Sequence, residues 1–457
     1  MKLSSKGLSA AIALALTTGI STQSQAAGFA LIENSASGMG NAFAGAAAIG
    51  EDASTVYFNP AAMTKLSGNN ISAAIHGIST SADFTNGSSS LWGGGNLTGI
   101  DDDGGVNAVV PNFYYTNQLS DYWTFGLGVN APFGLETNYD ENWIGRYQAT
   151  KSEVMTLNIN PSLAAKVSEK FSLGFGLSIQ YMEATLANKL DSGAICTKAI
   201  MATGQTFANA ELFCIGNSLA IGDAAVDSSQ SLNGDSWSWG VNIGMLYSIS
   251  ESTNLGIAYR SAVRHTLEGS VDFTRSTELD AFLGASTAFT DSAITASTQL
   301  PDSLSVSVTH AANDKMLILG DITWTDWSKF DELKIEFDNP AQYNSITPEN
   351  WGSSLRFSVG MNYQASDSMV YRVGLALDQT PIGSAEERTA RIPGNDRTWI
   401  SLGLGYKFSP EMSMDVGYSL LMVDDTPINN TDAFGHTLNG TYEADVNIFS
   451  VQGNFKF

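Results

Sequence analysis

Strict alternation of apolar and polar residues is the feature that most constrains what this chain can fold into. Residues 237–249 read WSWGVNIGMLYSI, with a large apolar side chain at every second position and mostly Ser, Gly or Asn between them. Residues 171–181 and 449–457 repeat the pattern. Because successive side chains of a β-strand point to opposite faces, each segment would have one apolar face and one small or polar face. Leu246 departs from the polar face of residues 237–249.

The composition favours a membrane barrel over a soluble β-sandwich, which would alternate in the same way. Charged residues make up 15% of the chain against 43% hydrophobic residues. The polar faces carry Gly, Ser and Asn, whereas a soluble sheet would carry Lys and Glu. Aromatic residues stand at one or both ends of the apolar faces, as in the girdles of transmembrane barrels. After the N-terminal segment no run of about 18 apolar residues occurs, which excludes spanning helices.

Fourteen strand-like segments can be counted, an even number, as bacterial single-chain barrels require. We therefore expect an all-β fold, a 14-stranded antiparallel transmembrane β-barrel in the bacterial outer membrane. Short connections would be periplasmic turns and long ones extracellular loops. The inserts 186–235 and 269–301 are rich in apolar residues, so we expect them to offer a hydrophobic surface outside the membrane. The segments begin near Asn70, Asn107, Trp123, Lys151, Phe171, Trp237, Thr253, Asp302, Lys315, Trp351, Met369, Thr398, Met412 and Thr441.

The first 26 residues have the layout of a secretory signal peptide. Lys2 and Lys6 precede an uncharged apolar stretch over residues 7–20. Small residues at Ser24 and Ala26 favour cleavage after Ala26.

Cysteine usage, charge and histidine placement argue against metal binding, nucleic-acid binding and lipid hydrolysis. Cys196 and Cys214 are expected to form a disulfide in an exported chain, and no histidine cluster lies between them, so no metal is expected. A net charge of −24 disfavours nucleic acid, which is bound by Lys and Arg. A lipid hydrolase would need an activated nucleophile. The histidines are scattered and no G-x-S-x-G occurs, so we expect neither an enzyme nor a cofactor. The histidines are His76, His265, His310 and His436.

Residues 27–68, ahead of a barrel over residues 69–457, show neither steady alternation nor a long helical stripe. Asn59 is a good helix N-cap, Pro60 suits the first helical position, and Ala61 can continue a short helix. A barrel of 14 strands leaves a lumen unless something fills it. We therefore expect residues 27–68 to form a plug, or hatch, with short helices.

The hatch segment AGFALIENSASGMGNAFAGAAAIGEDASTVYFNPAAM resembles that of the long-chain fatty acid outer-membrane transporter family, the FadL type with its aromatic-hydrocarbon relatives. Similarity continues through NWIGRYQATKSEVMTLNINPSLAAKV, TWTDWSKFDELK and RIPGNDRTWISLGLGYKFSP. The resemblance implies an outer hydrophobic groove, a deeper apolar pocket, and sideways exit of substrate into the membrane. The hatch residues that it implies for gating are Phe29, Gly38, Gly40, Asn59, Pro60 and Ala61.

Pro132 interrupts the third alternating segment. Proline cannot donate to a sheet ladder, and a closed barrel has no edge at which to place it. We therefore expect a local gap in pairing at Ala131, Pro132, Phe133 and Gly134, where the family places its wall opening. We also expect Asn59 to bond backbone groups near Pro132, and Phe29 to contact the deep pocket.

The basic residues depart from the family pattern. The family meets a carboxylate with one basic residue at the end of the fifth strand and another before the tenth. Lys189 is the candidate for the first, displaced by about one residue, and residues 346–349 contain no basic group for the second. Lys334 and Arg397 lie in matching motifs and are either lumenal or structural.

These features lead to the hypothesis of passive uptake of long-chain fatty acids or similar hydrophobic molecules. A channel for neutral hydrocarbons such as alkanes and monoaromatics is the alternative, and a general diffusion porin is a more distant one. The expected partners are the hydrophobic substrate and outer-membrane lipid and lipopolysaccharide. A monomer is expected.

Overall fold

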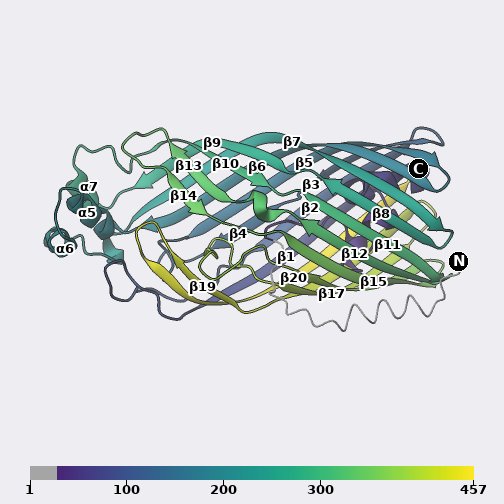
Figure 1. Cartoon of the computed structure of the whole chain (residues 1–457). Helices are drawn as coiled ribbons and strands as arrows, with labels where there is room; N and C mark the ends of the chain where they lie inside the picture. Colours follow the sequence, from purple (N-terminus) through teal and green to yellow (C-terminus); the bar gives the residue numbers. More distant parts are fainter. Residues whose placement is uncertain (1–27) are drawn as a thin grey trace.

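The computed structural model describes residues 28–457, and the expected signal peptide lies outside them. Twenty strands form one antiparallel sheet, which closes where the first strand, β1, pairs with the last, β20 (Figure 1). The strands are β1 Asn69–Asn86, β2 Asn107–Gln118, β3 Trp123–Asn130, β4 Gly134–Asn138, β5 Lys151–Ser168, β6 Phe171–Leu190, β7 Ser228–Ser250, β8 Thr253–Arg260, β9 Val263–Thr274, β10 Ser292–Leu300, β11 Ser303–Asn313, β12 Met316–Thr325, β13 Glu332–Phe337, β14 Ser345–Pro348, β15 Ser354–Ser366, β16 Met369–Asp378, β17 Arg397–Lys407, β18 Met412–Val423, β19 Thr426–Thr431 and β20 Thr437–Lys456.

The sheet is a barrel of 14 wall-spanning segments, as predicted. Each of these segments is called a stave below and consists of one continuous strand or of two consecutive strands. Six staves are interrupted and consist of two consecutive strands each: β3 with β4, β8 with β9, β10 with β11, β12 with β13, β14 with β15, and β18 with β19. For example, β3 and β4 both pair with β5, and β8 and β9 both pair with β7. The other eight strands are continuous.

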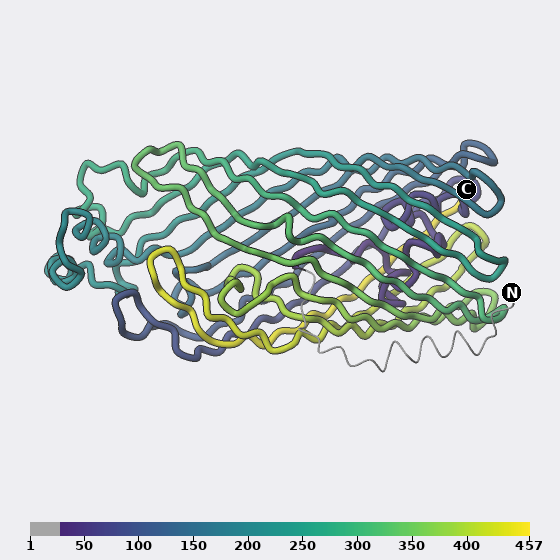
Figure 2. Tube along the Cα trace, in the orientation of Figure 1, coloured from purple at the N-terminus to yellow at the C-terminus, as the bar shows by residue number. Residues whose placement is uncertain are grey.

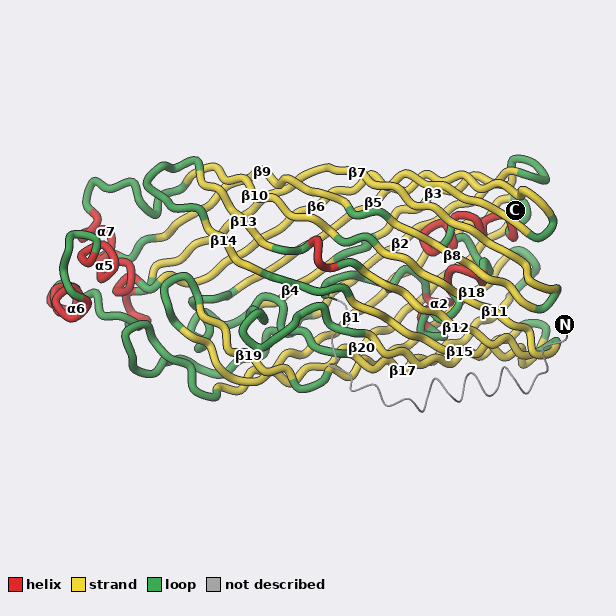
Figure 3. The backbone as a smooth tube through the Cα atoms, in the orientation of Figure 1, coloured by secondary structure: helices red, strands yellow, loops and turns green. Residues whose placement is uncertain are grey.

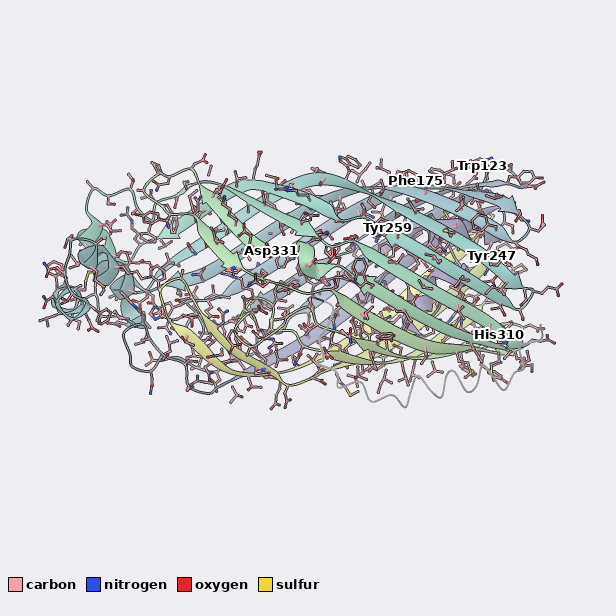
Figure 4. The ribbon with its side chains drawn as sticks, viewed as in Figure 1. Trp123, Phe175, Tyr247, Tyr259, His310 and Asp331 are labelled. Carbon is pink, nitrogen blue, oxygen red and sulfur yellow. A yellow bond between two sulfur atoms is a disulfide. The ribbon has the colours of Figure 1, made fainter. Side chains whose placement is uncertain are left out.

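The predicted alternation sorts side chains between the outer wall and the lumen. Trp239 is 69% exposed and Ile243 46% exposed, while Asn242 between them is 2% exposed. Trp123 and Phe175 also project from the outer wall (Figure 4). Leu246, the apolar residue on the polar face, packs against alanines of the segment inside the barrel. Its side chain faces protein and not water, which explains the departure from the pattern.

The two long inserts are shorter than expected, because strands continue into them. β6 runs to Leu190 and β7 begins at Ser228, while β9 runs to Thr274 and β10 begins at Ser292. Their inward apolar side chains form a cluster inside the extended wall, which keeps the strands paired. The remaining loops carry α5 Ser192–Met201, α6 Phe207–Gly216, η2 Ala224–Val226 and α7 Thr277–Leu283 at one end of the barrel (Figure 3). The cluster includes Leu232, Val271, Ile294 and Ile335.

The segment before β1 lies inside the barrel, toward the end opposite α5–α7 (Figure 2). Its short helices are α2 Ala36–Met39, α3 Ala46–Ile49, α4 Thr55–Phe58 and η1 Pro60–Lys65; a further short helix, η3 Trp327–Lys329, lies between β12 and β13. No helix within residues 28–457 is long and apolar enough to cross a membrane. Throughout the sections below, residues 28–68 are called the hatch.

Glycines let the hatch backbone approach the wall. A Cβ on Gly40 would lie 2.7 Å from the Cα of Gly403 in β17, so the two backbones touch directly. A Cβ on Gly174 in β6 would overlap the backbone of Ala61. The glycine-rich lumenal face is therefore shaped to hold this segment. Gly38 has a different role: a Cβ there would lie 2.7 Å from Phe43 within the hatch itself.

Candidate functional site

The wall is interrupted at residues 131–133, between β3 and β4. This interruption is called the kink below. β5 pairs with Asn130 through Asn158 and with Gly134 through Met155, so three residues of one stave stand opposite two of the other. On the opposite side, β2 pairs with β3 only from Phe113 onward, and among the described residues β2 makes no ladder with β4. Backbone groups at Pro132 and Phe133 are therefore left without a regular strand partner.

The first residues of the hatch fill this interruption. Residues 29–31, called here the N-terminal arm, form a bridge in which Ala30 pairs with Phe133. The Leu31 amide donates to the Pro132 carbonyl at 2.9 Å, and the Gly134 amide donates to the Phe29 carbonyl at 3.0 Å. The arm thus closes the wall with hydrogen bonds that another strand would otherwise make.

The backbone of Phe133 forms hydrogen bonds with a side chain of β5. Its amide donates to Thr156 Oγ1 at 3.0 Å, and the same hydroxyl donates to the Phe133 carbonyl at 2.6 Å. One threonine therefore satisfies both backbone groups of a residue that the ladder skips.

Asn59 does not reach Pro132, contrary to expectation. Its Oδ1 accepts from the Ala61 amide at 3.0 Å, so it caps η1 as its sequence position suggests. Its Nδ2 donates to the Ala47 carbonyl at 2.6 Å and to the Met245 carbonyl of β7 at 2.9 Å. Asn59 is fully buried and ties the hatch to the wall at β7. Pro60 is the first residue of η1.

Asn34, which was not singled out from the sequence, occupies the place expected for Asn59. Its Nδ2 donates to the Leu31 carbonyl at 2.9 Å. Its Oδ1 accepts from Tyr114 Oη at 3.2 Å and from Asn130 Nδ2 at 2.7 Å. It therefore links the N-terminal arm to β2 and β3 beside the kink. An asparagine inside a Gly- and Ala-rich motif carries no local signal for such long-range contacts.

Phe29 is the centre of an aromatic cluster, which we define as Phe29, Phe133, Trp327, Phe330 and Trp351. Ring centroids lie 4.9 Å from Phe29 to Trp327, 5.5 Å to Phe330, 6.0 Å to Phe133 and 6.1 Å to Trp351. Phe29 is 6% exposed, so it occupies the apolar space that these rings enclose.

A cavity of about 130 Å³ lies between the N-terminal arm and the wall. Its lining includes the apolar residues Leu31, Ile32, Phe58, Pro132 and Phe133. The lining also includes the charged residues Arg260, Arg356, Arg397 and Asp378, and the hydroxyl-bearing residues Ser303, Ser305, Thr323, Thr325 and Ser354. The lining therefore combines apolar residues, among them two of the kink, with charged and hydroxyl-bearing residues.

The candidate basic residues lie in different environments. Lys189 belongs to the outward-facing positions of β6, where it forms an ion pair with Glu141 at 2.8 Å, so it does not line the cavity. Lys334 pairs with Glu336 on β13 at 2.5 Å and is also away from the cavity. Arg397 lines the cavity and pairs with Asp378 at 3.0 Å.

Arg391 lies in the segment between β16 and β17 and is not among the basic residues that the sequence predicts as functional. Its guanidinium donates to the Lys151 carbonyl and Ser152 Oγ, both at 3.1 Å, and to Asn188 Oδ1 at 3.2 Å. Within residues 28–457 no carboxylate oxygen lies within ion-pair distance of it. Burial lowers the pKa of Arg391 to about 10. Burial raises the pKa of nearby Glu349 to about 8.

The outer loops expose an apolar surface on α6. Leu212 is 71% exposed, and Phe213 and Ile215 are about half exposed. The predicted disulfide between Cys196 and Cys214 is confirmed and joins α5 to α6. Other apolar residues of these loops pack together beneath the helices. The loops thus combine a pinned core with an exposed hydrophobic face.

Comparisons with known proteins agree with this architecture. The family model described as "Outer membrane protein transport protein (OMPP1/FadL/TodX)" matches residues 17–457. The chain is 30% identical to outer membrane protein P1 of Haemophilus influenzae, covering 94% of this chain and 95% of that protein. It is also 30% identical to a long-chain fatty acid transport protein of Escherichia coli, covering 90% of both chains.

Solved structures share the fold. A FadL homologue of Pseudomonas aeruginosa superimposes with a TM-score of 0.83 at 24% identity, covering 94% of this chain and all of that one. The toluene transporter TodX of Pseudomonas putida gives 0.64 at 17% identity, covering 89% and 94%. The barrel, the filled lumen and the match over nearly the whole length lead to one conclusion. This chain belongs to the OMPP1/FadL/TodX family of outer membrane transport proteins.

Proposed function

We propose that this protein takes up long-chain fatty acids, or similar hydrophobic molecules, by passive diffusion with sideways exit through the wall at residues 131–134. The observation that carries the proposal is the pairing of the N-terminal arm with the kink. Since the arm also holds Phe29 in the aromatic cluster, one movement of the arm would open the wall and loosen the cluster together. Hatch and exit would act as one gate.

The proposed path begins at the exposed apolar face of α6 and leads to the aromatic cluster. Burying an apolar chain is favourable by roughly 0.8 kcal/mol per CH₂, so substrate would move inward without another energy source. Tight burial would also retain it. Release would therefore need a shift of the arm that weakens the cluster and uncovers the gap between β2 and β4.

Uptake of neutral hydrocarbons is the second candidate. It is favoured by the apolar surroundings of Phe29 and by the position of Lys189, which pairs with Glu141 instead of facing the cavity. Among the similar structures, TodX is named as a toluene transporter. A general diffusion porin is less favoured, because the hatch occupies the lumen. Uptake of hexadecanoate compared with toluene separates the two candidates.

Regularising the wall tests sideways exit. Replacing Pro132 by Val and deleting Ala131 would let β3 run into β4 opposite β5 without the extra residue. In cells lacking their own transporter, we expect the uptake rate of labelled hexadecanoate to fall at least tenfold. This corresponds to an increase of about 1.4 kcal/mol or more in the activation free energy of uptake. Heat-modifiable migration on gels verifies folding.

Pro161→Val is the matched control. Pro161 lies within β5 opposite Leu127, where the register between β3 and β5 is unbroken, so this change should leave uptake unaltered. A correctly inserted Pro132 variant that transports at the wild-type rate would show that the exit lies elsewhere.

A further inference from the structure

His436 joins two loops at the end of the barrel that carries α5–α7. It lies in the turn between β19 and β20 and is 1% exposed. The backbone amide of Trp92, in the connection between β1 and β2, donates to its Nδ1 at 3.1 Å. Because a backbone amide can only donate, Nδ1 must be the acceptor, and the neutral ring of His436 carries its proton on Nε2.

The tip of the connection between β1 and β2 is anchored by this hydrogen bond. We define the loop tip as residues 91–95, Leu-Trp-Gly-Gly-Gly. Just before the tip, Ser90 and Thr437 exchange two backbone hydrogen bonds of 2.9 Å. The other backbone hydrogen bonds of the tip join Leu91 to Gly95 and Gly94 to Leu91, both within the tip. Within residues 28–457, the bond to His436 is therefore the one hydrogen bond that attaches the tip to another loop.

The loop tip covers the first residue of α6. The ring centroids of Trp92 and Phe207 lie 5.0 Å apart, with the rings nearly perpendicular. A Cβ on Gly93 would overlap the Phe207 ring, so the tip backbone rests directly on that side chain. Phe207 is thus partly covered, whereas Leu212 and Phe213 of the same helix are exposed.

Two carboxylates lie beside the His436 ring. Its Nε2 is 3.2 Å from Asp191 Oδ2 at the start of α5, although the two groups are not aligned for a hydrogen bond. Asp432 lies in the same turn as His436, and its Oδ1 accepts from the backbone amides of residues 434–436. Its Oδ2 is buried and has no partner within residues 28–457. Asp432 therefore offers a free acceptor close to the ring.

The other ionisable groups around the ring already have partners. Tyr147 stacks on His436 with ring centroids 4.9 Å apart, and its hydroxyl donates to Asp227 at 2.8 Å. Asp227 also forms an ion pair with Arg146 at 2.7 Å. Lys198 of α5 donates to a backbone carbonyl at 2.8 Å. In the described part of the chain, neither cation pairs with the two carboxylates beside His436, so these carboxylates would stabilise a proton on the ring.

We propose that His436 is an acid-sensitive switch, which holds the loop tip on α6 when neutral and releases it when protonated. A proton on Nδ1 would face the Trp92 amide, and two donors would then meet without an acceptor, which is unfavourable at a buried position. The protonated ring would instead pair with Asp191 and Asp432. Histidine ordinarily changes its charge between pH 5 and pH 8.

Release of the tip would uncover Phe207 and enlarge the apolar outer surface of α6. The three glycines of the tip all have positive φ, a conformation that glycine adopts and leaves readily, so the tip can rearrange while Ser90 stays in place. The switch goes beyond the uptake proposed above and does not depend on it, since it is read from the loop itself.

Hydrogen exchange over the loop tip at pH 5 and pH 8 tests the switch in the whole protein. After correction for the intrinsic pH dependence of exchange, we expect the protection of residues 91–95 in wild type to be about tenfold lower at pH 5. His436→Asn replaces Nδ1 by an amide oxygen, which can accept from Trp92 at both pH values. Its corrected protection should differ by less than about twofold between them. Heat-modifiable migration on gels verifies folding.

His310→Asn is the matched control. His310 shares a hydrogen bond of 2.9 Å with Thr253 Oγ1 and lies at the end of the barrel opposite α5–α7 (Figure 4). This variant should keep the pH response of the wild-type loop tip. Equal protection of the wild-type tip at pH 5 and pH 8 would overturn the switch, and so would a response that persists in His436→Asn.

A second measurement reads the ring itself. In nuclear magnetic resonance spectra of protein labelled with ¹⁵N-histidine, the His436 signals are those lost in His436→Asn. We expect the proton on Nε2 at pH 8 and protons on both ring nitrogens at pH 5. A proton on Nδ1 at pH 8, or a neutral ring at pH 5, would contradict the proposal.

Discussion

Individual hydrogen bonds and ion pairs made by buried polar side chains hold the hatch in the barrel. Asn59 joins the hatch to β7, Asn34 joins the N-terminal arm to β2 and β3, and Arg372 of β16 reaches Glu51 in the hatch at 3.1 Å. Such buried groups are satisfied only in one arrangement, so they specify a single position of the hatch. Loss of one partner leaves the others unpaired.

Asn59→Ala should weaken the hatch and impair uptake. The change removes a cap and two hydrogen bonds to backbone carbonyls, so we expect the hatch to lose about 2–3 kcal/mol. Hydrogen exchange over residues 46–63 measures the loosening, and hexadecanoate uptake measures the effect on transport. Asn59→Asp keeps the acceptor for Ala61 but loses both donated bonds, which separates capping from attachment to β7. Unchanged exchange in Asn59→Ala would contradict this role.

Glu349 makes stability depend on pH. Its folded-state pKa of about 8 lies above its ordinary value of 4.5 because of burial. The neutral form therefore stabilises the fold fully below pH 4.5, and this contribution is lost as the pH rises through about 8. The loss is at most about 5 kcal/mol. Urea unfolding in lipid vesicles at pH 5 and pH 9 should show a smaller drop for Glu349→Gln than for wild type, and parallel drops would contradict the shift.

Among the secondary-structure elements, part of the hatch takes the place of a wall strand at one position. β3 and β4 break at Pro132, and the missing partner strand is replaced by three residues of the N-terminal arm. At the other end, α5 and α6 form a helical pair above the barrel. The wall interruption is thus completed by residues that are distant in sequence, whereas α5 and α6 follow one another along the chain.

The disulfide between α5 and α6 should limit the freedom of the outer loop. In the chain-entropy model, a closure of this size is worth about 3 kcal/mol. Replacing Cys196 and Cys214 by Ser should increase hydrogen exchange over residues 192–216. Exchange in the barrel strands should stay unchanged and serves as the internal reference. Equal exchange over residues 192–216 in both proteins would show that packing alone holds the loop.

For the whole molecule, alternation was sufficient to predict the strand count and the barrel. Each stave carries its own period-two signal, so local sequence determines most of the fold. Contacts between distant segments could not be predicted in this way. The sequence predicts Asn59 as the hydrogen-bonding partner of the backbone near Pro132, whereas the N-terminal arm supplies that partner. Lys189 was displaced by one residue from the expected position, and a shift of one residue moves a strand side chain to the opposite face.

In the proposed mechanism the N-terminal arm must leave the kink before substrate can pass, and a reversible cross-link would prevent that movement. Ala30 and Phe133 pair across the bridge. The pair is flanked by the Leu31–Pro132 and Gly134–Phe29 hydrogen bonds, a geometry in which paired cysteines can join. Ala30→Cys with Phe133→Cys would lock the arm when oxidised. We predict that hexadecanoate uptake falls to background on oxidation and returns on reduction, while wild type treated with the same reagents is unaffected. Equal uptake by the oxidised and reduced forms would show that substrate passes without movement of the arm.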